Sequence, residues 1–150
     1  MTIEIRPVRD RDFFDWLPLF ASYGEFYGAQ VPDEKALLVW SWISDKVHGV
    51  SALVVQDDDG KLVGLAHYRP FPRPLEGGTG IYIDDLFVAP ESRGKGIASA
   101  LLDRVTEIAR SERAGIVRWA TAPDNDAAQS LSGKVADRTD WITYDRSVNG

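Results

Sequence analysis

The stretch IYIDDLFVAPESRGKGIA occupies residues 81–98 and is the most informative part of the chain. Residues 81–88 are rich in β-branched and aromatic side chains, which predicts a strand, and Pro90 ends it. A glycine-bearing loop at 93–96 follows, and the residues after it have the apolar spacing of an amphipathic helix. A strand, a tight loop and a helix N-terminus are therefore expected in direct succession.

The loop between the expected strand and helix favours an anionic ligand. The first N–H groups of a helix have no intrahelical partners, and the helix dipole adds partial positive charge, so a phosphate is stabilised there. Gly94, Gly96 and Ala98 leave room for a close approach, while Arg93 and Lys95 supply full charges. The alternative is a plain glycine turn before a helix.

Upstream of this stretch, the pattern predicts a short strand and two helices. Apolar and charged residues alternate at 3–6, which is typical of a strand. Asp10 is expected to cap a first helix, and Pro18 to kink or interrupt it. A second helix is expected from Pro32–Asp33, apolar over much of its circumference, as in a helix buried beneath loops.

A hairpin and a loop are expected between the helices and residue 81. Residues 50–55 and 61–68 are β-rich and flank an Asp-rich turn ending in Gly60, which predicts a hairpin. Residues 70–80 hold three prolines and three glycines, which favours an irregular, exposed loop.

The rest of the chain completes an α/β (α+β) pattern. A strand is expected at 116–120, a short helix at 125–135 and a final strand at 141–144. Helices and strands in this order predict one domain over residues 1–150, a mixed central sheet flanked by helices on both faces.

Composition excludes several functional classes. Seventeen basic and 23 acidic residues give a net charge of −6, so a nucleic-acid partner is not expected, and the charge serves solubility or attracts cationic ligands. The chain has no cysteine and only two histidines, so disulfides, a cysteine nucleophile and a structural zinc site are not expected. With no stretch long enough to span a membrane and no secretory signal pattern, the expected location is cytoplasmic.

Four segments together resemble the GNAT family of N-acetyltransferases. Residues 93–98 resemble its R-x-x-G-x-A acyl-CoA loop. Residues 81–88 are similar to the Y-L-E-D-L-F/Y-V strand of the polyamine and histone-type branch, with Asp84 where that branch usually has Glu. Residues 125–128 resemble the N-x-x-A start of the next motif, and residues 64–68 the preceding strand.

The resemblance implies the GNAT fold and acetyl-CoA as co-substrate, with no metal. The backbone of three strand residues would pair with the pantetheine arm like an added strand, which is sound edge pairing. The loop would hold the pyrophosphate, and an asparagine would lie near the thioester. The implied cofactor-binding residues are Leu86, Phe87, Val88, Arg93, Gly94, Lys95, Gly96, Ile97, Ala98 and Asn125.

An amine acceptor needs a base, because an alkylammonium has a pKa of about 10.4. The resemblance favours Asp84 as that base, directly or through water, with Asp85 holding a cationic substrate. Adjacent strand residues point to opposite faces unless a bulge intervenes. The alternative is that these carboxylates end a strand or pair with arginines. His67, Trp40 and Trp42 are candidate substrate-binding residues.

Ser132 stands where the family usually has a tyrosine that protonates the leaving thiolate. A coenzyme thiol with a pKa near ~8.5 is a fair leaving group, so a serine-held water is one way to supply the proton. Tyr23, Tyr27 and Tyr144 are the other candidates.

The resemblance implies direct acetyl transfer to a small primary amine, such as a polyamine or an amino acid. Two alternatives stay open: a catalytically weak acyl-CoA-binding sensor, which Ser132 favours, and a protein or peptide N-acetyltransferase. A homodimer formed through residues 141–144 is also implied.

Overall fold

The computed structural model describes residues 2–149. They divide into two compact units, residues up to 120 and residues from 121 onward. The first unit contains the sheet and three helices, and the second contains one helix and an irregular C-terminal segment. The first unit contains the residues around Asp84 and Asp85, and each unit is described by itself below.

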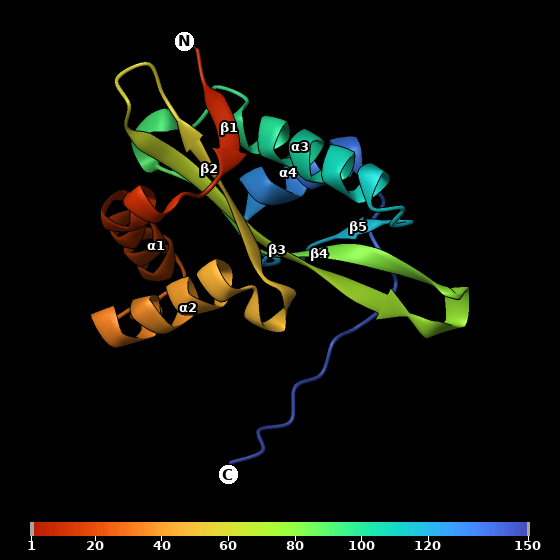
Figure 1. The fold of residues 1–150 in the computed structure, drawn as a ribbon. Coiled ribbons are helices and arrows are strands. Elements are labelled where there is room, and N and C mark those ends of the chain that lie inside the picture. The colour runs from red at the N-terminus through yellow and green to blue at the C-terminus, as the bar shows by residue number, and fades with distance from the viewer. Residues whose placement is uncertain (1, 150) are drawn as a thin grey trace. The chain divides into compact units, whose positions relative to one another are not determined.

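The first unit has a five-stranded sheet whose strand order follows the chain. Neighbouring strands are antiparallel except β4 and β5, which are parallel, so the sheet is mixed as expected. Figure 1 shows the long β3–β4 pair at its centre. The strands are β1 (Glu4–Pro7), β2 (Ser51–Gln56), β3 (Leu62–Arg73), β4 (Gly78–Val88) and β5 (Val117–Arg118).

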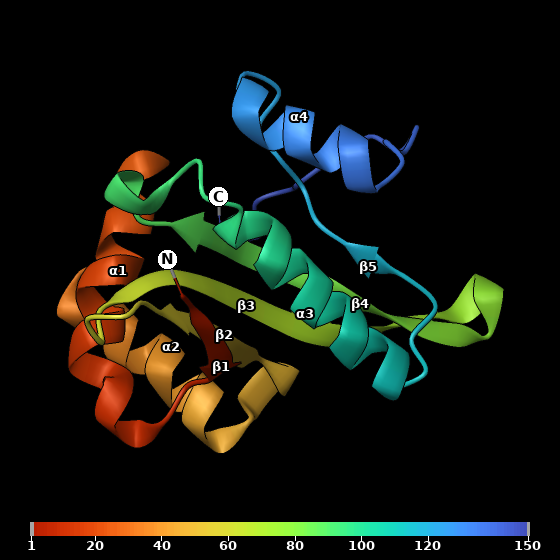
Figure 2. The same ribbon diagram turned by 90° about the horizontal axis from the view of Figure 1, so that it is seen from above.

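Helices cover both faces of this sheet, which confirms the expected fold class. Figure 2 shows α1 (Phe13–Phe26) and α2 (Asp33–Asp45) on one side and α3 (Ile97–Ser111) on the other. Trp16 and Phe20 of α1 pack with Val54 and Leu65 of the sheet in one buried cluster. On the opposite face, α3 lies against β3 and β4. Short 3-10 turns lie at Asp10–Asp12, Val47–Gly49, Pro74–Glu76 and Pro90–Ser92.

The start of α1 differs from the prediction. The helix begins at Phe13, after the 3-10 turn, so Asp10 is not its cap. The helix also runs through Pro18 without interruption, because the missing proline N–H costs one hydrogen bond while Trp16, Leu19 and Phe20 bury a whole face.

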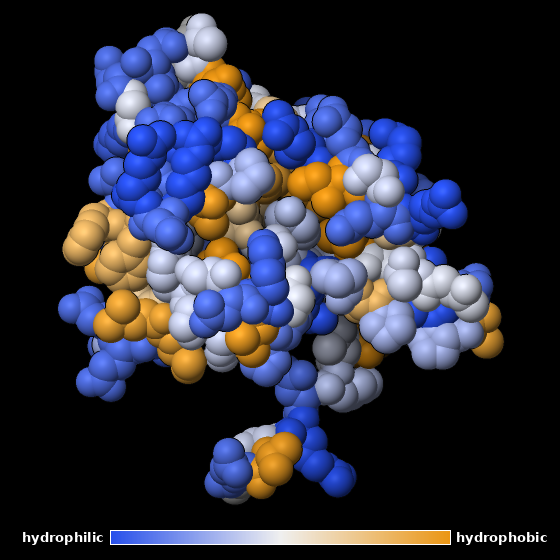
Figure 3. Space-filling model, viewed as in Figure 1, coloured by the Kyte–Doolittle hydropathy of each residue, from blue (hydrophilic) through white to orange (hydrophobic). Residues whose placement is uncertain are grey.

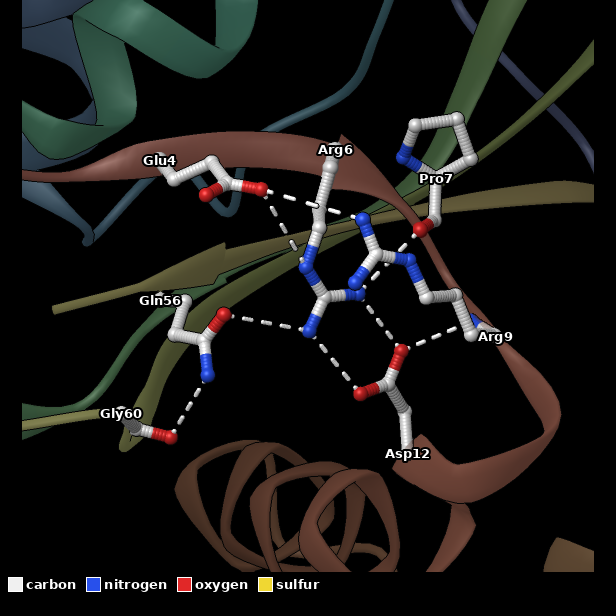
Figure 4. Close-up of polar contacts among 7 residues, drawn as sticks. All are labelled: Glu4, Arg6, Pro7, Arg9, Asp12, Gln56 and Gly60. Carbon is white, nitrogen blue, oxygen red and sulfur yellow. Dashed lines mark hydrogen bonds and ion pairs between the residues drawn. The ribbon is translucent and has the colours of Figure 1, made fainter.

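Asp12 is not free to cap α1, because its carboxylate binds Arg6 of β1 (Figure 4). Arg6 Nη1 and Nη2 lie 2.7 and 3.0 Å from the two Asp12 oxygens, and the Arg9 backbone N–H donates to the same carboxylate at 2.7 Å. Both side chains of the pair are buried. The hydrogen bond from Arg6 lowers the pKa of Asp12 and ties β1 to the entry of α1.

The prediction that α2 is buried on most sides is wrong. Ala36 and Ile43 are buried, whereas Leu37 and Leu38 are about half exposed. Figure 3 shows apolar side chains on the surface over α1 and α2. α2 therefore buries only a narrow stripe of its surface, although much of its sequence is apolar.

The loop expected at residues 70–80 is instead the tip of a long β3–β4 hairpin. β2 pairs with β3 only as far as Tyr68, so beyond that point β3 is bordered by β4 alone. Pro70 and Pro72 still pair with Ile81 and Thr79. Prolines are tolerated there because an edge strand does not need an N–H on its outer side.

The C-terminal part keeps the expected helix and loses the expected strand. The helix α4 covers Asp126–Val135, and the strand expected at 116–120 shortens to Val117–Arg118. Residues 141–144 form no strand, and Trp141 and Tyr144 are more than four-fifths exposed. Residues 121–149 contain no strand with which residues 141–144 could pair.

Candidate active site

A bulge in β4 decides the geometry of the two adjacent aspartates. His67 pairs with Asp85, and the next β3 residue, Tyr68, pairs with Ile83, so Asp84 is an extra residue in β4. Without the extra residue, neighbouring side chains would alternate between faces. With it, Asp84 and Asp85 line the same pocket.

This pocket has a volume of about 420 Å³ and lies wholly in the first unit. One part of its wall is apolar, and the other carries groups that bind charge. The apolar part consists of Phe20, Val39, Trp42 and Val50, and the polar part of His48, His67, Arg69, Asp84 and Asp85.

Of the candidate substrate-binding residues, His67 and Trp42 line the pocket and Trp40 does not. The Trp40 ring instead packs on Trp16 and Phe13, with ring centroids 5.0 and 5.3 Å away. Trp42 meets His48 edge-on at 5.1 Å. His48 has a φ of 60°, an uncommon conformation for a non-glycine residue, at the turn that leads into β2.

His67 is 2% exposed and is held from both sides. The indole N–H of Trp16 donates to Nε2 at 3.1 Å, and Nδ1 lies 2.9 Å from Asp85 Oδ2. Because an indole nitrogen only donates, Nε2 must be the unprotonated nitrogen and Nδ1 must carry the proton. His67 is therefore neutral here and donates to Asp85, which fixes the direction of that carboxylate.

Tyr23 is the second group that acts on Asp85. Burial would raise the pKa of Asp85, but the hydrogen bonds from His67 and Tyr23 outweigh it and the pKa is lowered. For Tyr23, burial and then the negative charge of Asp85 raise the pKa of the phenol well above its ordinary value. Asp85 is thus ionised and Tyr23 is protonated at neutral pH.

Asp84 has a different partner, as the arginine-pairing alternative predicted. Arg69 binds it with two hydrogen bonds, Nε to Oδ2 at 2.9 Å and Nη2 to Oδ1 at 3.2 Å. The Arg69 guanidinium also lies over the Tyr82 ring, 5.1 Å from its centroid. Asp84 and Arg69 keep about a third of their side chains exposed, so both are in contact with solvent at the pocket.

Directly after the aspartates, β4 has a free edge. On its inner side Leu86, Phe87 and Val88 pair with Ala66, Leu65 and Gly64 of β3. On its outer side, within residues 2–149, β5 pairs only with Ile81 and Tyr82. Among residues 2–149 no strand pairs with residues 83–88 on that side, where the Val88 carbonyl accepts from the Arg93 side chain, and this edge can accept an extended ligand.

The loop after β4 has the backbone of an anion site. Gly94 and Gly96 have φ of +77° and +79°, and a Cβ at either would have no atom within 4 Å, so the loop surface is open. Gly96 precedes α3 without a side-chain cap, and the first turn of α3 holds no acidic residue. The first N–H groups of α3 are thus available to a phosphate.

The predicted cofactor side chains take up different positions around this loop. The Arg93 Nε donates to the Val88 carbonyl at 3.1 Å, and its guanidinium lies 4.8 Å from the Phe26 ring centroid and 5.5 Å from that of Phe87. Lys95 is exposed and Ala98 half-buried. Ile97 is buried in the core, so it offers only its backbone.

Asn125 and Ser132 belong to the second unit, where α4 positions them. Asn125 is the N-cap of α4, and its Oδ1 accepts from the Ala128 N–H at 3.1 Å. Ser132 lies half-buried on the same helix. Of the other candidate acids, Tyr144 is 86% exposed and Tyr27 packs edge-on against Tyr23 at 5.1 Å.

Sequence reasoning missed the roles of Trp16, Tyr23 and Arg69. Apolar residues at 13, 16, 17 and 20 have helical spacing, which favours a core face, and the same helix supplies the two donors that reach His67 and Asp85. Arg69 follows the segment that resembles the family strand, and nothing in its local sequence indicates a partner 15 residues away.

Among residues 2–149, no group of three or more His, Cys, Asp or Glu side chains lies close enough to hold a metal ion. In the same part of the chain, every helix is too short or too polar to cross a membrane.

The chain is similar to known proteins over most of its length. The D-amino-acid N-acetyltransferase HPA3 of Saccharomyces cerevisiae is 29% identical over 97% of this chain and 91% of its own. A ribosomal-protein-alanine N-acetyltransferase from Brucella melitensis biovar Abortus 2308 is 25% identical, with 97% and 99% coverage and a TM-score of 0.80.

A third likeness concerns the fold alone. The aminoglycoside N-acetyltransferase AAC(6')-Iy, solved in complex with CoA, is 18% identical over 98% of this chain and 95% of its own, with a TM-score of 0.83. The model of the acetyltransferase (GNAT) family matches residues 16–135. The chain therefore belongs to the acetyltransferase (GNAT) family and is an N-acetyltransferase.

Proposed function

We propose that the protein transfers the acetyl group of acetyl-CoA to the primary amine of a small molecule, by direct attack within a ternary complex. The observation that carries the proposal is the β4 bulge, which turns both Asp84 and Asp85 into one pocket immediately before the free edge at Leu86–Val88. The acceptor and the thioester then meet at the same point of one strand.

Asp84 and Asp85 take different roles in this proposal. Asp85 is ionised and oriented by His67 and Tyr23, so it binds the incoming ammonium group. Asp84 is in contact with solvent and accepts the ammonium proton through one water, because Arg69 occupies both of its oxygens directly. The free amine then attacks the thioester carbonyl carbon, and the C–S bond breaks as the C–N bond forms.

The chain's own residues fit the co-substrate. The outer strand edge at residues 86–88 suits the amides of a pantetheine arm, and the open loop at Gly94–Gly96 suits the pyrophosphate of the co-substrate. Arg93, Lys95, Ile97, Ala98 and Asn125 remain the other proposed contacts. Ser132 is the proposed carrier of the proton for the leaving thiolate, through a water.

The acceptor is a primary amine of a polyamine, an amino acid or a similar small cation. The acidic balance of the chain and the two pocket carboxylates support a cationic group. The relative from Saccharomyces cerevisiae is named for D-amino acids, which supports an amino acid among these. A cytoplasmic location and a homodimer formed through residues 141–144 belong to the same proposal.

The test is an acceptor panel with free thiol as the readout. The purified protein is mixed with acetyl-CoA and polyamines, amino acids, aminoglycosides or a basic peptide, and thiol is followed with a colorimetric disulfide. The protein adds no background because it has no cysteine. Amine-dependent thiol release with an acetylated product supports the proposal. An intact thioester with every amine, together with stabilisation by acetyl-CoA, contradicts it and favours the sensor.

A further inference from the structure

Arg69 has hydrogen-bonding capacity that the pair with Asp84 does not use. A guanidinium carries five N–H donors. Nε and one hydrogen of Nη2 bind Asp84, which leaves three donors, two on Nη1 and one on Nη2. Within residues 2–149, no hydrogen bond or ion pair engages Nη1.

The unused donors lie on one edge of the guanidinium, and that edge has the geometry of a carboxylate fork. Nη1 and Nη2 point in parallel and match two carboxylate oxygens at once. The group is also held in place, by Asp84 on its other edge and by the Tyr82 ring 5.1 Å away. A ligand therefore meets a guanidinium that has already lost its freedom to rotate.

The charges of the pocket suit a zwitterion better than a polycation. The Asp84 charge is already matched by Arg69, whereas Asp85 receives only neutral donors, from His67 and Tyr23. Asp85 is thus left to bind one ammonium group, and the outer edge of Arg69 to bind one anion. A second ammonium of a polyamine would meet only N–H donors at that edge and no acceptor.

The apolar part of the pocket wall indicates what else the acceptor carries besides its two charged groups. Phe20, Val39, Trp42 and Val50 line the pocket with apolar surface. We propose that Arg69 binds the carboxylate of the acceptor, which, on the transfer proposed above, is an α-amino acid with an apolar or aromatic side chain. Arg69 is then a specificity-determining residue that bridges Asp84 and the substrate.

The experiment compares acceptors that differ only by a carboxylate. Phenylalanine is paired with phenethylamine and leucine with 3-methylbutylamine, each amino acid as both enantiomers, and spermidine represents the polyamines. Thiol release from acetyl-CoA is measured for the wild type, Arg69→Gln, Arg69→Lys and Arg73→Gln. Arg73 lies four residues along the same strand and does not line the pocket, so its variant is the matched control.

The wild type should prefer an amino acid over its decarboxylated partner by about 100-fold in kcat/KM. Arg69→Gln should remove that preference by raising KM for the amino acid about 100-fold relative to KM for the amine, while any change in kcat through the contact with Asp84 should be the same for both. Arg69→Lys keeps the positive charge but lacks the two parallel donors, so its preference for the amino acid should lie between those of the wild type and Arg69→Gln. Arg73→Gln should match the wild type.

Two results overturn the assignment while acetyl transfer stands: equal use of both members of a pair by the wild type, or a preference for the amino acid that is unchanged in Arg69→Gln. If no acceptor releases thiol, the proposed function fails. The carboxylate site is then tested by itself, by calorimetric titration of phenylalanine or leucine into the protein in the presence of CoA. Binding that Arg69→Gln abolishes, in a variant that melts like the wild type, supports the carboxylate site. No binding to the wild type refutes it.

Discussion

The indole N–H of Trp16 donates to Nε2 of His67 across 51 residues of sequence, at 3.1 Å. Trp16 is fully buried and stacks on Phe20, with centroids 4.9 Å apart. A residue of the core thereby selects the protonated nitrogen of a pocket histidine. The direction of Asp85 depends on that selection, because Nδ1 of His67 is its donor.

Replacing Trp16 by Phe tests this dependence. The change leaves Nε2 of His67 buried without a donor and removes part of a packed ring, so the free energy of unfolding should fall by about 3 kcal/mol. Chemical denaturation followed by circular dichroism measures it. Trp141→Phe, at an 84% exposed position, should change the free energy of unfolding by less than about 0.5 kcal/mol. Equal effects at both positions would argue against the buried hydrogen bond.

The two pocket aspartates should separate in kinetics. Asp84→Asn removes the proposed base and should lower kcat by roughly 100-fold. Asp85→Asn removes the charge that holds the ammonium and should mainly raise KM for the amine, by about 10-fold. Steady-state kinetics from pH 6 to pH 9 distinguish them. Asp59→Asn, in the exposed β2–β3 turn, serves as control, and a kcat unaffected by Asp84→Asn would remove Asp84 from the mechanism.

The buried pair of Arg6 and Asp12 predicts a pH dependence of stability. Arg6 lowers the pKa of Asp12 in the folded state, so this stabilisation is fully present above the ordinary aspartate pKa of about 3.9 and is lost as pH falls through the folded value. Asp12→Asn should lower the free energy of unfolding by roughly 3 kcal/mol at pH 6. The difference from wild type should shrink steadily below about pH 4.

Urea unfolding at several pH values measures that difference. Glu91→Gln is the matched comparison, since the Lys61–Glu91 pair has a similar length, 2.9 Å, but both of its side chains are exposed. Solvent screens such a pair, and its loss should have little effect at any pH. A difference between Asp12→Asn and wild type that stays constant from pH 6 to pH 2 would contradict the role given to the Asp12 charge.

What the sequence predicts correctly is local. The β2–β3 hairpin and α3 follow from turn residues and apolar spacing within a dozen positions, and Asn125 caps α4 as its residue type favours. The prolines at 70 and 72 misled the prediction because their tolerance depends on where β2 stops pairing with β3. No local pattern carries that information.

The candidate site illustrates the same limit more sharply. Adjacent aspartates on a strand predict opposite faces, and only the register of β3 against β4 reveals the bulge that brings Asp84 and Asp85 together. The sequence makes Trp40 and Trp42 equally good candidates for substrate binding. In the structure Trp40 packs on Trp16, whereas Trp42 lines the pocket. The side chains that set the state of Asp85 come from α1 and β3, far away in the chain.

Substituting Gly96 by Ala tests the loop before α3. Gly96 has a φ of +79°, where a Cβ costs roughly 1–2 kcal/mol. The loop can relieve the strain only by turning its N–H groups, so affinity for CoA should fall about 10-fold, as measured by isothermal titration calorimetry. Gly78→Ala is the matched change, since Gly78 has ordinary backbone angles and its Cβ would also meet open space. That variant should keep wild-type affinity and stability. If Gly96→Ala binds CoA as tightly as Gly78→Ala does, binding of the pyrophosphate does not depend on the left-handed backbone at the start of α3.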